Sequence, residues 1–304
     1  MRFTKTLTAT AAALLATVAL PACAQPAPQA APAATTDADP ALWVVKDADT
    51  TIYLFGTVHV LKPGLSWFDE AVKTAFDSSG ELVLEMVAPE PAEAQKIVMA
   101  KAVDADGPAL SQKLSEGDRA AYVKAMTDVG LPWQQIEPFK PWMASVTLSM
   151  TGLGKAGYDP NSGAEKVLTA AAEAAKKPIS ALETMEQQLG FFDGLPEPTQ
   201  ITFLNATVKD MPKLTTVMGD MISSWSKGDH EALGSLLNEN MKETPEIAKV
   251  LLFDRNARWA DWIGQRLAKP GTVFIAVGAG HLAGKQSVQD YLAAKKLTAT
   301  RVTY

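Results

Sequence analysis

The stretch Thr51-Ile-Tyr-Leu-Phe-Gly-Thr-Val-His59 predicts a short buried strand, Ile52 to Phe55, followed by a glycine and, three residues later, a histidine. The same arrangement returns near the other end of the chain as Thr272-Val-Phe-Ile-Ala-Val-Gly-Ala-Gly-His281. A glycine just past a strand lets the backbone turn sharply and approach a ligand closely. Two of the three histidines of the chain are therefore placed by a strand and a glycine.

Two further predicted strands, Leu82–Glu85 and Pro178–Glu183, each end in a glutamate. In an open α/β sheet, the loops at the carboxyl ends of the strands form the ligand crevice, so we expect these glutamates and both histidines at one site. An imidazole there can bind a divalent metal or act as a general base, and a carboxylate can be a further ligand or activate water. Two histidines without cysteine ligands predict an open metal site that retains water.

Each of these residues could instead only satisfy the backbone of its own loop, which is the usual explanation of a single short motif. Their recurrence at several strand ends favours a shared site. The third histidine, in Lys227-Gly-Asp-His230, resembles a helix start, and we interpret it as a surface cap or a solvated residue. Arg255 shares a helical face with Trp259 and Trp262, so it either decorates the solvent face or is held inward by stacking.

The remaining pattern is mainly helical, which predicts one α/β domain over residues 41–304, with a central mixed sheet and many flanking helices. Single helices are predicted at Ser66–Phe76, Gly163–Lys177, Ile247–Leu267 and Ser287–Lys296. Residues 92–150 are predicted to be mostly helical, and broken helices are predicted from Met185 to about Lys242. Ser66 with Asp69, and Ser115 with Asp118, are the predicted capping pairs. A last strand is predicted at Thr298–Tyr304.

Residues 1–24 resemble a secretory signal peptide, with a basic start and an apolar run too short to cross a membrane comfortably. Residues 25–40, rich in proline and alanine, predict either a semi-extended linker or a leftover without a role. Leu20-Pro-Ala-Cys23 resembles a lipobox that would lipidate Cys23, whereas Ala22-Cys-Ala24 equally fits cleavage after Ala24. We therefore expect export to a bacterial periplasm, free or anchored to the envelope by a lipid on Cys23.

The charge and the cysteine content of the chain bear on two questions, namely whether it binds nucleic acid and whether disulfide bonds stabilise it. The formal net charge is −6 and no cluster of lysine and arginine occurs, which gives no support for nucleic-acid binding. Cys23 is the single cysteine, so the mature fold has no internal disulfide. No pattern in the sequence indicates an oligomeric state.

Five segments together resemble the TraB/GumN family, which includes the Tiki proteins, and the resemblance extends from about Leu42 to Tyr304. These segments are Tyr53-Leu-Phe-Gly-Thr-Val-His59, Leu82-Val-Leu-Glu85, Leu182-Glu-Thr-Met-Glu-Gln-Gln188, Arg255-Asn256 and Gly278-Ala-Gly-His-Leu-Ala-Gly284. The resemblance implies a fold similar to that of erythromycin esterases and the haem-binding ChaN proteins. Tiki proteins are membrane-tethered peptidases that use Mn or Co.

By this resemblance we expect a peptidase acting on a peptide or protein, with a divalent metal held by His59, His281 and Glu85. The metal would be Mn or Co, with Zn as an alternative, and Glu85 would be a further ligand or the base. Arg255 would polarise the carbonyl or stabilise the oxyanion, and Glu183 would orient a histidine. The alternative is a protein that binds haem, a metal ion or a peptide in the same crevice without turnover.

Overall fold

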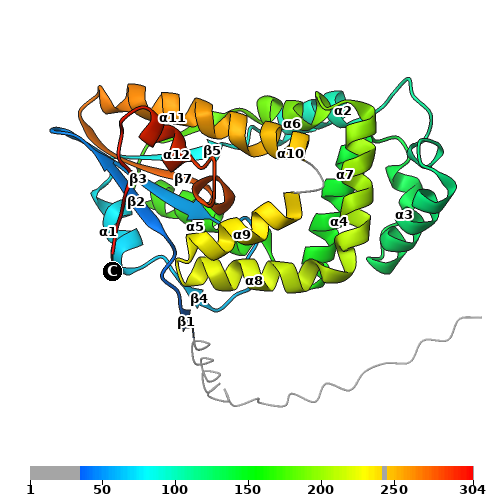
Figure 1. The fold of residues 1–304 in the computed structure, drawn as a ribbon, viewed down its shortest axis with the longest axis horizontal. Coiled ribbons are helices and arrows are strands. Elements are labelled where there is room, and N and C mark those ends of the chain that lie inside the picture. The colour runs from blue at the N-terminus through cyan, green and yellow to red at the C-terminus, as the bar shows by residue number, and fades with distance from the viewer. Residues whose placement is uncertain (1–34, 242–244, 304) are drawn as a thin grey trace, which may run out of the picture. The chain divides into compact units, whose positions relative to one another are not determined.

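The computed structural model describes residues 35–241 and 245–303 (Figure 1). The predicted signal peptide, Cys23 and the first part of the predicted linker lie outside these residues. The strands are β1 Thr36–Asp37, β2 Leu42–Lys46, β3 Thr50–Thr57, β4 Leu65–Ser66, β5 Glu81–Met86, β6 Ile179–Glu183, β7 Gly271–Gly278 and β8 Thr300–Arg301. The α-helices are α1 Glu70–Ser78, α2 Pro91–Ala102, α3 Glu116–Asp128, α4 Pro141–Lys155, α5 Ala164–Ala174, α6 Met185–Asp193, α7 Glu197–Asp210, α8 Leu214–Ser226, α9 His230–Met241, α10 Pro245–Ala248, α11 Asp254–Leu267 and α12 Val288–Ala294.

Six strands form the central sheet in the order β6-β5-β7-β3-β2-β8. Strands β6, β5, β7 and β3 run parallel, whereas β2 is antiparallel to both β3 and β8, so the predicted mixed sheet is confirmed. β7 lies between two parallel neighbours, and Val273 to Val277 are all buried, which explains its unbroken apolar run. Because Thr57 of β3 pairs with Gly278 of β7, the two histidine-bearing segments leave the sheet side by side.

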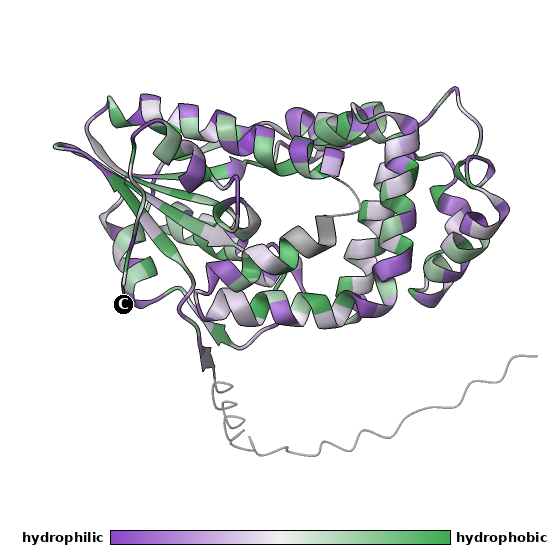
Figure 2. Ribbon diagram, viewed as in Figure 1, coloured by the Kyte–Doolittle hydropathy of each residue, from purple (hydrophilic) through white to green (hydrophobic). Residues whose placement is uncertain are grey.

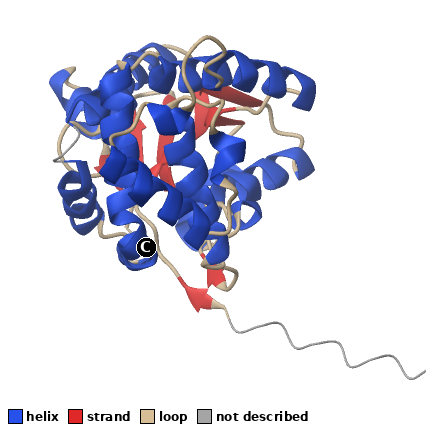
Figure 3. Ribbon diagram, turned by 90° about the vertical axis from the view of Figure 1, so that its right-hand side faces the viewer, coloured by secondary structure: helices blue, strands red, loops and turns tan. Residues whose placement is uncertain are grey.

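Helices cover both faces of this sheet (Figure 3). Alternate strand residues point to opposite faces, so Phe274 packs with Phe76 of α1 and Leu168 of α5, whereas Ile275 packs with Trp259 and Ile263 of α11. The middle of the sheet is mostly hydrophobic, as Figure 2 shows. A further apolar cluster joins helices α3, α4 and α7 beyond the carboxyl ends of the strands.

Pairing between β1 and β4 corrects two predicted boundaries. Thr36 pairs with Leu65, and Ala38 is buried, so the last residues assigned to the linker belong to the folded domain. The carbonyl of Ser66 accepts the Ala38 N–H at 2.8 Å, which commits Ser66 to the strand. The helix predicted from Ser66 therefore begins at Glu70, and the Ser66 hydroxyl donates to the side chain of Asp69 at 2.5 Å instead of capping a helix.

Other predicted elements occur with changes. β2, which the sequence analysis did not predict, pairs with β3. The predicted cap at Ser115 is confirmed, because its hydroxyl accepts the Asp118 N–H at 3.2 Å. The helix predicted over Ile247–Leu267 is interrupted by a π-helical turn at Lys249–Phe253, and the last strand is reduced to Thr300–Arg301. Within the described ranges, none of the helices has the length and apolarity needed to cross a membrane.

Candidate functional site

A cavity of about 420 Å³ lies at the carboxyl ends of β3, β5 and β7. His59, Glu85, Arg255 and His281, all singled out from the sequence, line it. Its full lining consists of Thr57, Val58, His59, Val60, Glu85, Met150, Leu153, Gln188, Phe191, Phe192, Met218, Met221, Leu233, Leu251, Leu252, Arg255, Gly278, Ala279, Gly280 and His281. Glu183 lies behind this surface and is buried.

Both histidines and Glu85 converge on Gly278, the last residue of β7. A side chain at this glycine would begin 3.1 Å from Glu85 Oε1, 3.6 Å from His59 Nε2 and 3.7 Å from His281 Cδ2. The Gly278 N–H also donates to Glu85 Oε1 at 2.6 Å. Only a residue without a side chain leaves the space between the two rings and the carboxylate open.

His59 is held by Glu165, a residue that the sequence analysis missed. Glu165 lies in the first turn of α5, and its Oε1 is 2.6 Å from His59 Nδ1 and accepts the Thr57 hydroxyl at 2.5 Å. The start of α5 is pinned there because the Ala164 N–H donates to the carbonyl of Val58. An acidic residue in a first helical turn is ordinary, so its sequence position did not distinguish Glu165.

The hydrogen bond to Glu165 raises the pKa of His59 to about 9, against the opposing effect of partial desolvation. The side chain of His59 is 66% exposed and lines the cavity. Burial raises the pKa of Glu165, but its bonds to His59 and Thr57 outweigh this and lower it. Near neutral pH the metal-free pair is therefore an imidazolium and a carboxylate.

His281 is held by Asn256. The Asn256 amide group donates through Nδ2 to the carbonyl of Gln286 at 2.8 Å, which turns Oδ1 towards His281 Nδ1 at 2.5 Å. A carbonyl oxygen only accepts, so Nδ1 of His281 carries the hydrogen and Nε2 presents its lone pair to the cavity. Burial and the charge of Arg255 lower the pKa of His281 to about 3, so the ring is neutral.

Arg255 is buried and points into the site, which confirms the inward alternative and excludes a place on the solvent face. Its Nη2 bonds Glu85 Oε2 at 2.8 Å and Glu183 Oε2 at 2.7 Å. Nη1 donates to the Leu251 carbonyl at 3.0 Å and faces His281 Nε2 at 3.1 Å. The guanidinium lies 4.8 Å from the centre of the Trp259 ring, and the π-helical turn that precedes α11 supplies the Leu251 carbonyl.

Glu183 was expected to orient a histidine, but in the structure it bonds Arg255 instead. Its oxygens accept the Nε–H of Arg255 at 3.0 Å, the Trp259 Nε1–H at 3.1 Å and the Gln188 amide at 3.2 Å. Strand β5 separates β6 from β7, so Glu183 reaches the guanidinium rather than His281. It therefore orients Arg255, while Asn256 and Glu165 orient the histidines.

Arg255 also sets the charge of Glu85. Burial raises the pKa of this carboxyl, but the neighbouring His281 ring, the charges of Arg255 and His59 and the hydrogen bond from the Gly278 N–H together outweigh burial and lower the pKa to about 2. Arg255 stays charged at every pH of interest. Glu85 is therefore ionised at neutral pH.

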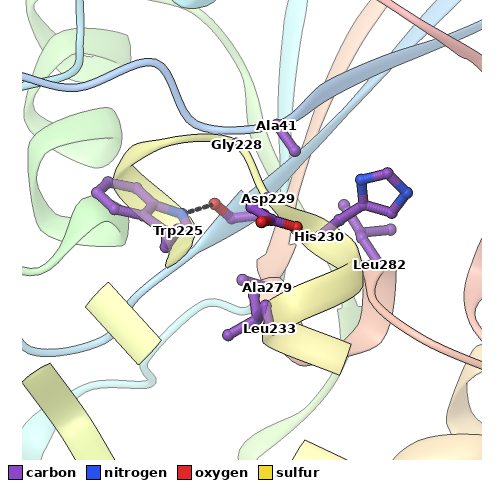
Figure 4. Close-up of a pocket in the computed structure, with 9 residues that line it drawn as sticks. Ala41, Trp225, Gly228, Asp229, His230, Leu233, Ala279 and Leu282 are labelled. Atoms are coloured by element: carbon purple, nitrogen blue, oxygen red, sulfur yellow. Dashed lines mark hydrogen bonds between the residues drawn. The ribbon is translucent and has the colours of Figure 1, made fainter. Parts of the chain in front are cut away.

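His230 lies outside this cavity, as its sequence position suggested. It is the first residue of α9, and its ring meets the edge of Trp43 with centroids 4.9 Å apart. Asp229, not His230, caps the helix, because its Oδ1 accepts the Ala232 N–H at 2.9 Å. Figure 4 shows the small pocket that His230 and Trp225 help to line. This pocket has a volume of about 10 Å³, just enough for a single water.

The donor chemistry of the main cavity fits an open metal centre. Metal-binding histidines usually donate their other ring N–H to an oxygen acceptor, and both His59 and His281 are held this way through Nδ1. Within residues 35–241 and 245–303, however, no group of three or more acidic, cysteine or histidine side chains is already arranged as a metal site. A metal using His281 Nε2 would replace its hydrogen bond with Arg255.

Comparison with known proteins finds a matching family and a similar protein. The model of the TraB/PrgY/gumN family matches residues 41–301. The chain is also similar to an uncharacterized protein of Treponema pallidum (strain Nichols), with 21% identity over 273 residues that cover 84% of this chain and 80% of that protein. No solved structure matches the chain significantly.

Proposed function

This chain belongs to the TraB/PrgY/gumN family, and from that membership we propose that it is a hydrolase, a metal-dependent peptidase. One observation supports the proposal above the others. Two imidazoles, each held through Nδ1 by an oxygen acceptor, meet an ionised glutamate around a glycine that leaves the space between them open. A neutral Nε2 and a carboxylate facing one point are the donors that a catalytic divalent metal requires.

His59, His281 and Glu85 would hold the metal, which is Mn or Co by the family resemblance. When bound, such a metal supplies a Lewis acid that lowers the pKa of a water. Glu85 Oε1, 3.6 Å from His281 Nε2, is placed either to complete the ligand set or to accept the proton of that water. Gln188 and Arg255 hold the other oxygen of this carboxylate at 3.2 and 2.8 Å, which keeps Oε1 directed at the rings.

Arg255 would stabilise the negative charge that develops on the oxygen of the attacked carbonyl. Its guanidinium is held in place, because Nε and Nη2 donate to Glu183 and the Trp259 ring lies against its face. The Nη1 group now faces His281 Nε2 and would be released when that nitrogen binds another partner. A donor that is fixed before the reaction costs no reorganisation at the transition state.

Metal binding is expected to release about one proton per site at pH 7, because bound ligands must be deprotonated. His59, with a pKa of about 9, carries that proton, whereas His281 and Glu85, with pKa values of about 3 and about 2, have none to lose. Below pH 9 the affinity should rise about tenfold per pH unit, and above pH 9 it should level off. Calorimetry of Mn binding in buffers of different ionisation enthalpy measures this release.

Glu165→Gln provides the comparison, since it removes the charge that raises the pKa of His59. In this variant the released fraction at pH 8 should fall well below that of the wild type. Glu173→Gln, an exposed change on the same helix, should behave like the wild type. Binding with no proton release between pH 6 and 8 would mean that His59 is not a ligand.

The proposal itself is tested with wild-type protein purified without chelator. We expect bound divalent metal by elemental analysis, and cleavage of members of a peptide library that stops with chelator and returns with Mn or Co. The alternative is a binder of haem, a metal ion or a peptide in the same cavity. Co-purification of such a ligand, with no cleavage by the metal-loaded protein, would favour the binder and reject the peptidase.

A further inference from the structure

The polar groups of the cavity are already bonded to one another. All five N–H groups of Arg255 have acceptors, namely the two glutamates, the Leu251 carbonyl and His281 Nε2. The Gly278 N–H, the Thr57 hydroxyl and the Gln188 amide likewise donate to carboxylates of the site. Beyond the reacting groups, these side chains have little hydrogen-bonding capacity left with which to distinguish one substrate from another.

Many of the other side chains that line the same cavity are apolar. The principal ones, here called the apolar wall, are Met150, Phe191, Phe192, Met218, Met221 and Leu252. They come from α4, α6, α8 and the π-helical turn, which are far apart in sequence. None of them is fully buried, and Met150 is 41% exposed. Covering such partly exposed apolar surface with an apolar group of a ligand is favourable, so the apolar wall is suited to bind such a group.

The apolar wall begins at the reacting groups. The ring of Phe191 lies 5.6 Å from the guanidinium of Arg255, so a group bound against Phe191 is next to the bond that Arg255 would polarise. Phe192 is fixed by stacking on Trp142, with centroids 5.3 Å apart. The three methionines are unbranched and adaptable, which suits aliphatic and aromatic groups alike. The cavity of about 420 Å³ lies within the range of about 300–1,000 Å³ that is usual for ligand sites.

We propose that the apolar wall binds a large apolar side chain of a peptide, on the residue next to the cleaved bond, and that this contact selects the substrate. The inference rests on the proposed peptidase function, because it places the side chain relative to a bond that the site hydrolyses. A wall that supplies burial without directional hydrogen bonds distinguishes side chains by size and polarity. Leucine, methionine and phenylalanine should therefore be accepted, and alanine and serine disfavoured.

The test uses capped pentapeptide amides that differ only in the central residue, which is alanine, serine, leucine, methionine or phenylalanine. Binding to metal-free protein is measured by calorimetry, and cleavage by Mn-loaded protein is measured by mass spectrometry. We expect the leucine and phenylalanine peptides to bind at least about tenfold more tightly than the alanine peptide, and to be cleaved with a similar advantage in kcat/KM. Met221→Gln and Met150→Gln should each reduce this ratio severalfold.

Met99→Gln is the matched control, because Met99 is 53% exposed on α2 and does not line the cavity. It should leave the ratio unchanged. Cleavage without preference for large apolar residues, or a ratio untouched by Met150→Gln and Met221→Gln, would overturn the inference while the peptidase stands. Selective binding without any cleavage would retain the apolar contact and reject the peptidase. Tight binding of long-chain acyl esters in place of the peptides would overturn the inference in favour of a lipid.

Discussion

Replacing either His281 or His59 with alanine is expected to lower the affinity for Mn by more than about 100-fold, which exceeds the usual 10–100-fold loss for a residue that only supports a ligand. Each ring leaves the sheet at a strand end and is locked through Nδ1 by its own acceptor, Asn256 or Glu165. Hydrolysis by the loaded protein should be lost with the metal, and calorimetry measures both variants directly.

The comparison variants set the scale. Glu183→Gln should cost less, within about 10–100-fold, because Glu183 acts on Arg255 and not on a proposed ligand. The double histidine variant should be little worse than either single one, since residues that act as a unit are not additive. His230→Ala should have no effect, because that ring packs on Trp43 outside the cavity. An equal loss in His230→Ala and His281→Ala would refute this assignment of the site.

Arg255→Met is expected to lower the free energy of unfolding by about 3–5 kcal/mol, the usual cost of removing one partner from a buried ion pair. It leaves two carboxylates without their cation, and the side chains of Glu85 and Glu183 are only 12% and 5% exposed. Urea denaturation at pH 7 measures the loss. The loss should shrink as the pH falls towards 4, because the uncompensated carboxylates then bind protons and become neutral in the folded state.

Arg258→Met is the matched control. Arg258 lies on the same helix, and its guanidinium is 3.8 Å from Glu183, but its side chain is 51% exposed. An exposed pair is worth at most about 1 kcal/mol, so this variant should be nearly as stable as the wild type. Equal losses in the two variants, or a loss for Arg255→Met that does not change with pH, would show that the buried charges are not its origin.

Much of the central sheet could be read from local sequence because its parallel strands are short apolar runs that end at glycine or a charged residue. Val273 to Val277 of β7 is such a run, and Leu82 to Leu84 of β5 is another. β1 and β4 could not be predicted from local sequence, because each consists of two residues and forms only by pairing with the other. The π-helical turn was also missed, since its sequence, Lys249-Val-Leu-Leu-Phe253, has an ordinary helical composition.

The two histidines and Glu85, which face the cavity, could be predicted from the sequence, because each lies at or just after a strand end and parallel strands bring their carboxyl ends to one edge. The partners of those residues were decided only by tertiary structure. Glu165 and Asn256 belong to helices, and a helical position alone does not show which neighbour a side chain reaches. The packing of α5 on the β3 loop and of α11 on the sheet brings each to its histidine. The order of the strands also explains why Glu183 pairs with Arg255. Strand β5 lies between β6, which ends at Glu183, and β7, which leads to His281.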